Sequence, residues 1–330
     1  MSAAKKLLDR PELGVAAAVV AAWLFFAFYA GDSGFLSSRG TATYLEIASE
    51  LGILAAPVAL LMIAGEFDLS IGSTMAACGM TIALCCDKLG WPIWGGIAAA
   101  AALALAVGFF NGFVVTKTRL PSFIVTLGSL FILAGGTIGM TRLITGRTQI
   151  GGLEEAGGFG AAETLFAGHV GPISASVLWW IAITALAAWV LLRTRSGNWI
   201  FGVGGAPDSA RRVGIPVARV KISLFMMTSL AACLVATFQV VKFTGADVLR
   251  GTGKELEAIL AAVLGGTLLT GGRGSVLGAA CGALLFGMVQ QGIVFAGVDS
   301  DWYKVFLGAM LLLAVLLNSS VQTRMAEARR

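Results

Sequence analysis

Long apolar runs alternate with short polar segments along almost the whole chain. Most runs are close to twenty residues long, and none shows the short alternating pattern of outer-membrane strands, so helices are the expected spanning form. We therefore predict an all-α, polytopic transmembrane helix bundle. It has about ten spans, near 13–30, 43–64, 70–86, 92–116, 121–140, 171–192, 222–243, 257–270, 276–296 and 302–318. The eighth run is short for a full crossing, and we expect it to be tilted or partly re-entrant.

Composition supports a membrane protein. The chain is 57% hydrophobic and only 12% charged, whereas an ordinary soluble domain is about 25% charged. The first apolar run follows Lys5, Lys6 and Arg10 as a signal peptide would, but it is longer and no small-residue cleavage site follows it. We read it as an uncleaved first span and expect one transmembrane domain over residues 1–330.

The distribution of positive charge predicts the orientation. If the N-terminus is cytoplasmic, the loops on that side carry about twice as many Lys and Arg as the opposite loops. This bias predicts that both termini are cytoplasmic, as an even number of spans requires. It also places the polar segment 193–221 inside and the Gly-rich segment 141–170 outside.

The polar segment contains the pattern of a short helix. Pro207 suits a first helical position, and Asp208 lies in the first turn, where an acid favours the positive helix end. Arg211 and Arg212 lie toward the negative end, and Gly214 can supply a left-handed cap. We expect a cytoplasmic helix over 207–214.

A helix this short is not stable alone in water. Ala210, Val213 and Ile215 would give it a small apolar face. Two roles remain open from the residues alone: a connector that lies on the lipid headgroups, or a helix that docks on a partner protein.

The stretch GEFDLSIGS (65–73) places carboxylates between the second and third spans. Asp68 either lies in a cytoplasmic edge loop and caps the next helix, by accepting N–H groups near Ser70 to Gly72, or marks a pathway through the membrane. Glu66 is either a pathway residue or a solvated residue at the rim. Apart from these two acids, we expect few ionisable residues in the spans.

Other polar and glycine positions have two readings each. The amides Asn111, Gln239 and Gln290 either hydrogen-bond between helices or, with Ser70, line a pathway. The glycines of GGTLLTGGRGS allow either close packing of backbones or a hinge; they are Gly265, Gly266, Gly271, Gly272 and Gly274. The five cysteines lack metal-ligand spacing, and we expect no metal site.

Four stretches together resemble a known family. They are GEFDLSIGS (65–73), NGFVVTKTRLPSFIVTLGSL (111–130), GVGGAPDSARRVGIPVARVK (202–221) and ELEAILAAVLGGTLLTGGRGSVLGA (255–279). In this order and spacing they resemble permease subunits of ribose-type ABC importers, although Glu66 replaces the Gly that is usual in the acidic motif. The resemblance implies a bacterial inner-membrane permease, paired with a second permease copy or a close homologue. Two ATPase chains and an extracytoplasmic binding protein that delivers a monosaccharide or a related polyol would complete the importer.

The resemblance also implies that residues 204–217 dock in a groove on the ATPase. The coupling residues would be Pro207, Asp208, Ala210, Arg211, Arg212, Val213, Gly214 and Ile215. Independently, the chain lacks a phosphate-binding loop, because GTGKELE (251–257) has neither the leading Gly nor a hydroxyl after its Lys. We therefore expect no enzymatic activity, no bound cofactor and no nucleic-acid partner, with ATP and Mg²⁺ used by a separate chain.

The main alternative is an ion-coupled secondary transporter of a small neutral solute. Such a protein would be expected to carry ionisable relays near the middle of the membrane. A membrane scaffold without transport would not need a helix that contacts an ATPase.

Overall fold

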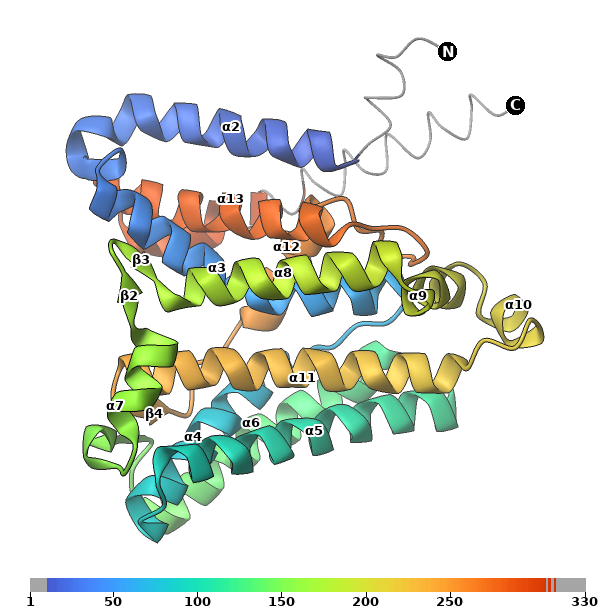
Figure 1. Cartoon of the computed structure of the whole chain (residues 1–330), viewed down its shortest axis with the longest axis horizontal. Coiled ribbons are helices and arrows are strands. Elements are labelled where there is room, and N and C mark those ends of the chain that lie inside the picture. Colours follow the sequence, from blue (N-terminus) through green and yellow to red (C-terminus); the bar gives the residue numbers. More distant parts are fainter. Residues whose placement is uncertain (1–10, 307, 310–311, 313–330) are drawn as a thin grey trace.

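The computed structural model describes residues 11–306, 308–309 and 312. Its long helices lie roughly side by side in one bundle (Figure 1). In chain order they begin with α2 (Pro11–Ala30), α3 (Ser38–Ile63), α4 (Ile71–Leu89), α5 (Ile93–Thr118), α6 (Ser122–Thr145), α8 (Ala175–Arg193) and α11 (Val217–Lys242). The short α12 (Lys254–Leu264) and the long α13 (Val276–Phe295) follow.

The two ends of the bundle differ. One end carries α9 (Arg195–Gly205) and α10 (Pro207–Arg212) and is called the α10 end below (Figure 1). The other end, the strand end, carries short elements. These are η1 (Gly31–Phe35), β1 (Gln149–Gly151), η2 (Leu153–Glu155), α7 (Phe159–Ala162), η3 (Glu163–Ala167), β2 (His169–Val170), β3 (Ile173–Ser174), β4 (Gly245–Asp247) and η4 (Ser300–Trp302).

Helices α3 and α11 form the centre of the bundle. The most apolar window of α3 is 83% buried within the chain and that of α11 is 78% buried, whereas the corresponding window of α6 is only 11% buried. The exposed side chains of α5 and α6 are large and apolar, such as Phe113 and Phe131, as lipid-facing positions are. Side chains on α3 and α11 therefore mostly face protein rather than lipid.

Seven helices in the described part of the chain are long and apolar enough to cross a membrane. The expected count of about ten is not reached for three identifiable reasons. The run at 70–86 forms α4, which is not among the seven; the run at 257–270 forms the eleven-residue α12. The run at 302–318 and both termini lie mostly outside the described residues.

The strand end departs from the all-α prediction. Helix α6 continues to Thr145, and the segment expected as a plain loop over 141–170 folds into short elements. Strand β1 pairs antiparallel with β4, with Gln149 opposite Asp247, and β2 pairs with β3, with His169 opposite Ser174. These strands are too short to give a hydropathy signal, but β1–β4 pairing ties the segment after α11 to the segment after α6.

Candidate functional site

The acidic segment 64–70 turns back into the bundle after α3 ends. The N–H of Phe67 donates to Ser122 Oγ at 3.0 Å, and the N–H of Leu69 donates to Thr126 Oγ1 at 3.1 Å. Ser122 and Thr126 lie on successive turns at the start of α6. The segment therefore runs inward along α6, and α4 begins inside the bundle.

Asp68 lies at the inner end of this segment and is 1% exposed. Its Oδ1 accepts the N–H of Ser70 at 2.9 Å and the Ser70 hydroxyl at 2.6 Å, and its Oδ2 accepts the Thr228 hydroxyl at 2.7 Å. Thr228 is the twelfth residue of α11, about 16 Å along that helix at 1.5 Å per residue. The contact with the Ser70 N–H agrees with the capping reading. The expected position in an edge loop is wrong, because the carboxylate is buried in the bundle and bonded to α11.

Asn111 belongs to the same network. Its Nδ2 donates to Ser70 Oγ at 2.9 Å, and its Oδ1 accepts the Ser129 hydroxyl at 2.5 Å. All three side chains are buried. Ser70 and Asn111 thus join α4, α5 and α6, which fits the helix-packing reading of the amide.

Glu66 is buried rather than solvated at a rim. Its Oε1 pairs with Lys221 Nζ, near the start of α11. The acidic segment is therefore attached to α11 at two places, by an ion pair at Glu66 and by a hydrogen bond at Asp68.

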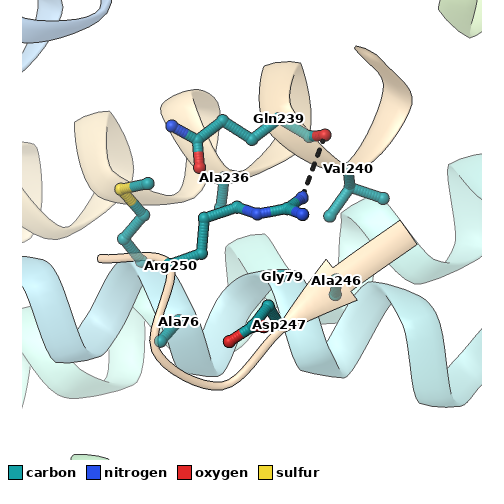
Figure 2. Close-up of a pocket in the computed structure, with 9 residues that line it drawn as sticks. Ala76, Gly79, Ala236, Gln239, Val240, Ala246, Asp247 and Arg250 are labelled. Atoms are coloured by element: carbon teal, nitrogen blue, oxygen red, sulfur yellow. Dashed lines mark hydrogen bonds between the residues drawn. The ribbon is translucent and has the colours of Figure 1, made fainter. Parts of the chain in front are cut away.

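A small pocket lies toward the strand end, between α4, α11 and the chain that follows β4 (Figure 2). Its polar lining residues are Gln239, Asp247 and Arg250. Arg250 Nη1 donates to the carbonyl oxygens of Gly245 at 2.9 Å and Gln239 at 3.4 Å. The guanidinium also lies over the Phe243 ring, 4.6 Å from its centroid. The Arg250 side chain thus links the segment after β4 to the end of α11.

Gln239 connects this pocket to α3. Its Nε2 donates to Glu50 Oε2 at 2.7 Å, while its buried Oε1 has no partner among the described residues. One turn away, Lys242 Nζ pairs with Glu46 Oε1 at 2.8 Å. Gln290 is half-buried on α13 and does not line the pocket.

The expectation of few ionisable residues in the spans is wrong at α3. Glu46 and Glu50 lie within the second predicted span and are spaced one helical turn apart. Two carboxylates on one face of an otherwise apolar run predict a polar neighbour on a facing helix. That spacing was the signal available in the sequence.

At the α10 end, the predicted short helix is present as α10, with Pro207 at its first turn. Asp208 pairs with Arg211 at 3.2 Å, Arg212 is the last residue of α10, and Gly214 has a φ of 85°. The preceding helix α9 was not predicted. Ala210 is 5% exposed and Ile215 is partly buried, and both contact α9 near Gly202; Val213 is 77% exposed. Of the three residues expected on a docking face, only Val213 is available to a partner.

The Gly-rich segment is a backbone packing element. A Cβ on Gly265 would lie 2.2 Å from the carbonyl carbon of Gly278, and a Cβ on Gly274 would lie 2.6 Å from the Ile63 side chain. Gly266, Gly271 and Gly272 all have positive φ. These contacts fit the close-packing interpretation, while a hinge stays a prediction.

The comparisons with known proteins fit this architecture. The family model described as branched-chain amino acid transport system / permease component matches residues 40–315. The chain belongs to this permease family. No solved structure gives a significant match.

Curated relatives of the permease are themselves permease proteins. It is 36% identical to the ribose import permease protein RbsC of Escherichia coli over 284 residues, 84% of this chain and 85% of the relative. It is 31% identical to the xylose transport system permease protein XylH of the same species over 371 aligned positions, 97% of this chain and 94% of the relative. It is 32% identical to the autoinducer 2 import system permease protein LsrD of Klebsiella pneumoniae, over 82% of this chain and 80% of the relative. The resemblance deduced from the four motifs is confirmed.

Proposed function

We propose that the permease moves a monosaccharide or a related polyol across the bacterial inner membrane as the spanning subunit of an ABC importer. The observation that carries the proposal is the identity of 31–36% with ribose and xylose permeases over at least 84% of the chain. The family description names branched-chain amino acids, but RbsC and XylH are named for the sugars ribose and xylose. A separate ATPase supplies the energy, and an extracytoplasmic binding protein supplies the substrate.

The α10 end is the side on which we place the cytoplasm. Positive side chains gather there, in and beside the helix ends: Lys117, Arg119, Arg193, Arg195, Arg211, Arg212, Arg219, Lys221 and Arg273. Membrane proteins retain such Lys and Arg excess on the cytoplasmic side. Helix α10 then protrudes where an ATPase can reach it, and Val213 offers an exposed apolar contact.

Transport with a defined energy source tests the function. Proteoliposomes that contain the permease with its ATPase and binding protein should accumulate radiolabelled ribose or xylose when ATP is present. Accumulation should persist when ionophores collapse the proton and sodium gradients. Uptake that follows an ion gradient and ignores ATP would instead support the secondary transporter, and uptake of leucine in place of sugar would overturn the substrate class.

A surface substitution tests the docking helix. Val213→Asp adds a charge to an exposed apolar position and should abolish co-purification of the ATPase, because a desolvated charge in an interface has no partner. Val170→Asp is the matched control, since Val170 is 67% exposed at the strand end and should leave co-purification unchanged. Equal ATPase recovery with both variants would place the docking surface elsewhere. Ala210→Asp is unsuitable, because Ala210 is packed inside the chain.

A further inference from the structure

The last turn of α9 rests on a junction built from backbone alone. A Cβ on Gly204 would lie 1.7 Å from the carbonyl oxygen of Ile63 and 2.7 Å from the amide nitrogen of Gly272. No side chain fits at that position unless backbone moves. The C-terminal end of α3 and the Gly-rich segment therefore both lie directly against α9.

The two segments under α9 also contact each other. The N–H of Gly272 donates to the Ile63 carbonyl at 2.8 Å, and a Cβ on Gly271 would lie 2.8 Å from the Cα of Gly65. Gly65, Gly271 and Gly272 have positive φ, which a residue with a side chain rarely adopts. The junction thus joins three segments that are remote in sequence: 63–65, 204–205 and 271–272.

Each of the underlying segments leads straight to a helix that begins or ends inside the bundle. Residues 64–70 connect the junction to α4, through the Asp68 network described above. Residues 265–275 connect it to α12 on one side and α13 on the other. The starts of α4 and α12 meet in turn, because a Cβ on Gly72 would lie 2.3 Å from the carbonyl oxygen of Gly251 and 2.2 Å from Glu255 Oε2.

The junction is also continuous with α10. Ala206 alone separates α9 from α10, the Ala210 N–H donates to the Ala206 carbonyl at 2.9 Å, and Ile215 packs on Gly202. Helices α9 and α10 therefore form one packed unit. At Gly204 no side chain separates α9 from the backbones of Ile63 and Gly272. Closely packed elements of this kind shift as units rather than deform.

We propose that Gly204 is a positioning residue for transport, through which movement of α10 is passed to α4 and α12. The inference rests on the proposed function of α10 as the helix that docks on the ATPase. Gly204 touches neither substrate nor ATPase in this role. It sets the position of the interior helices relative to α10.

Gly204→Ala and Gly205→Ala form a matched pair. Both add one methyl group to the last turn of α9, but the Cβ on Gly205 would meet only the Cα of Gly272, at 4.0 Å. Both variants should co-purify with the ATPase, because each changes a residue of α9 and leaves the exposed Val213 side chain in place. Gly204→Ala should lower uptake and the stimulation of hydrolysis by loaded binding protein about tenfold, within the range of a coupling between sites. Gly205→Ala should match the wild type.

Equal coupling in the two variants would overturn the role of Gly204, whereas absence of ATP-driven uptake by the wild type would overturn the proposed function itself. If Gly204→Ala does not assemble, the proposal is tested on the wild-type complex. Hydrogen exchange is then compared in the nucleotide-free and vanadate-trapped states. If movement of α10 passes through Gly204, protection changes together in 195–215, 64–70 and 265–275. A change confined to 195–215 would refute it.

Discussion

Removal of the Thr228 hydroxyl should destabilise the permease through Asp68. The hydroxyl donates at 2.7 Å to a carboxylate that is 1% exposed, and the Phe225 carbonyl of the same helix lies 2.8 Å from this hydroxyl. Among the described residues, the carboxylate accepts two other donors, both from Ser70. Side-chain hydrogen bonds between membrane helices are worth about 0.6 kcal/mol on average, with a maximum near 1.7 kcal/mol. We therefore expect a coupling free energy between Asp68 and Thr228 of about 0.6 to 1.7 kcal/mol.

A double-mutant cycle with Thr228→Val, Asp68→Ala and the double variant measures this coupling. Unfolding is followed by tryptophan fluorescence as SDS is added to mixed micelles. Asp68→Ala should lower the free energy of unfolding more than Thr228→Val does, because the Ser70 N–H and hydroxyl also lose their acceptor.

Thr237→Val provides the control for burial and for the loss of a hydroxyl. Thr237 is also 1% exposed on α11, but within the part of the chain that the structure describes its hydroxyl donates only to the Cys233 carbonyl of the same helix, at 2.9 Å. Thr237→Val should therefore be milder than Thr228→Val. The reasoning is refuted if the losses in free energy of unfolding caused by Asp68→Ala and Thr228→Val sum to the loss in the double variant to within about 0.3 kcal/mol, because independent sites add to that precision.

Three further outcomes are expected. In a version without the native cysteines, Ser196→Cys in α9 and Gly160→Cys in α7 should react with impermeant maleimide from opposite faces of the membrane; labelling from one face would contradict the proposed orientation. Gly72→Ala should lower the thermal stability in detergent, because its Cβ would lie 2.3 Å from the Gly251 carbonyl oxygen. Gly79→Ala should be tolerated, because its Cβ would make ordinary contacts with the side chains of Val240, Ala246 and Ala236, at 3.5 Å or more. Isothermal titration of the permease–ATPase complex without its binding protein should give weaker than micromolar binding of free ribose, and tight binding would place substrate specificity in this chain.

Local signals were enough to locate most elements. The runs predicted at 92–116 and 276–296 form α5 and α13 within a few residues, because each is apolar throughout and its helical hydrogen bonds are internal. The short helix after Pro207 was found for the same reason, since its proline, its charges and its glycine act within one or two turns. The family could also be predicted from the sequence, because its motifs are contiguous stretches.

How deep each element lies in the bundle could not be predicted from such local signals. Hydropathy gave α4 as a complete span, yet it begins where Asp68 meets Thr228, 160 positions further along the chain. The same limit applied to Glu50, whose partner Gln239 is 189 positions away.

The sequence by itself determined that this protein is a helical membrane permease with a capped polar helix between two of its spans. Tertiary structure alone decided that Ala210 packs inward and that Gly204 meets the backbones of Ile63 and Gly272. The physical reason is the range of the forces involved. Transfer into lipid and helix capping depend on the residue and its near neighbours, whereas a buried carboxylate or a glycine without space for a Cβ is defined by atoms that only folding brings beside it.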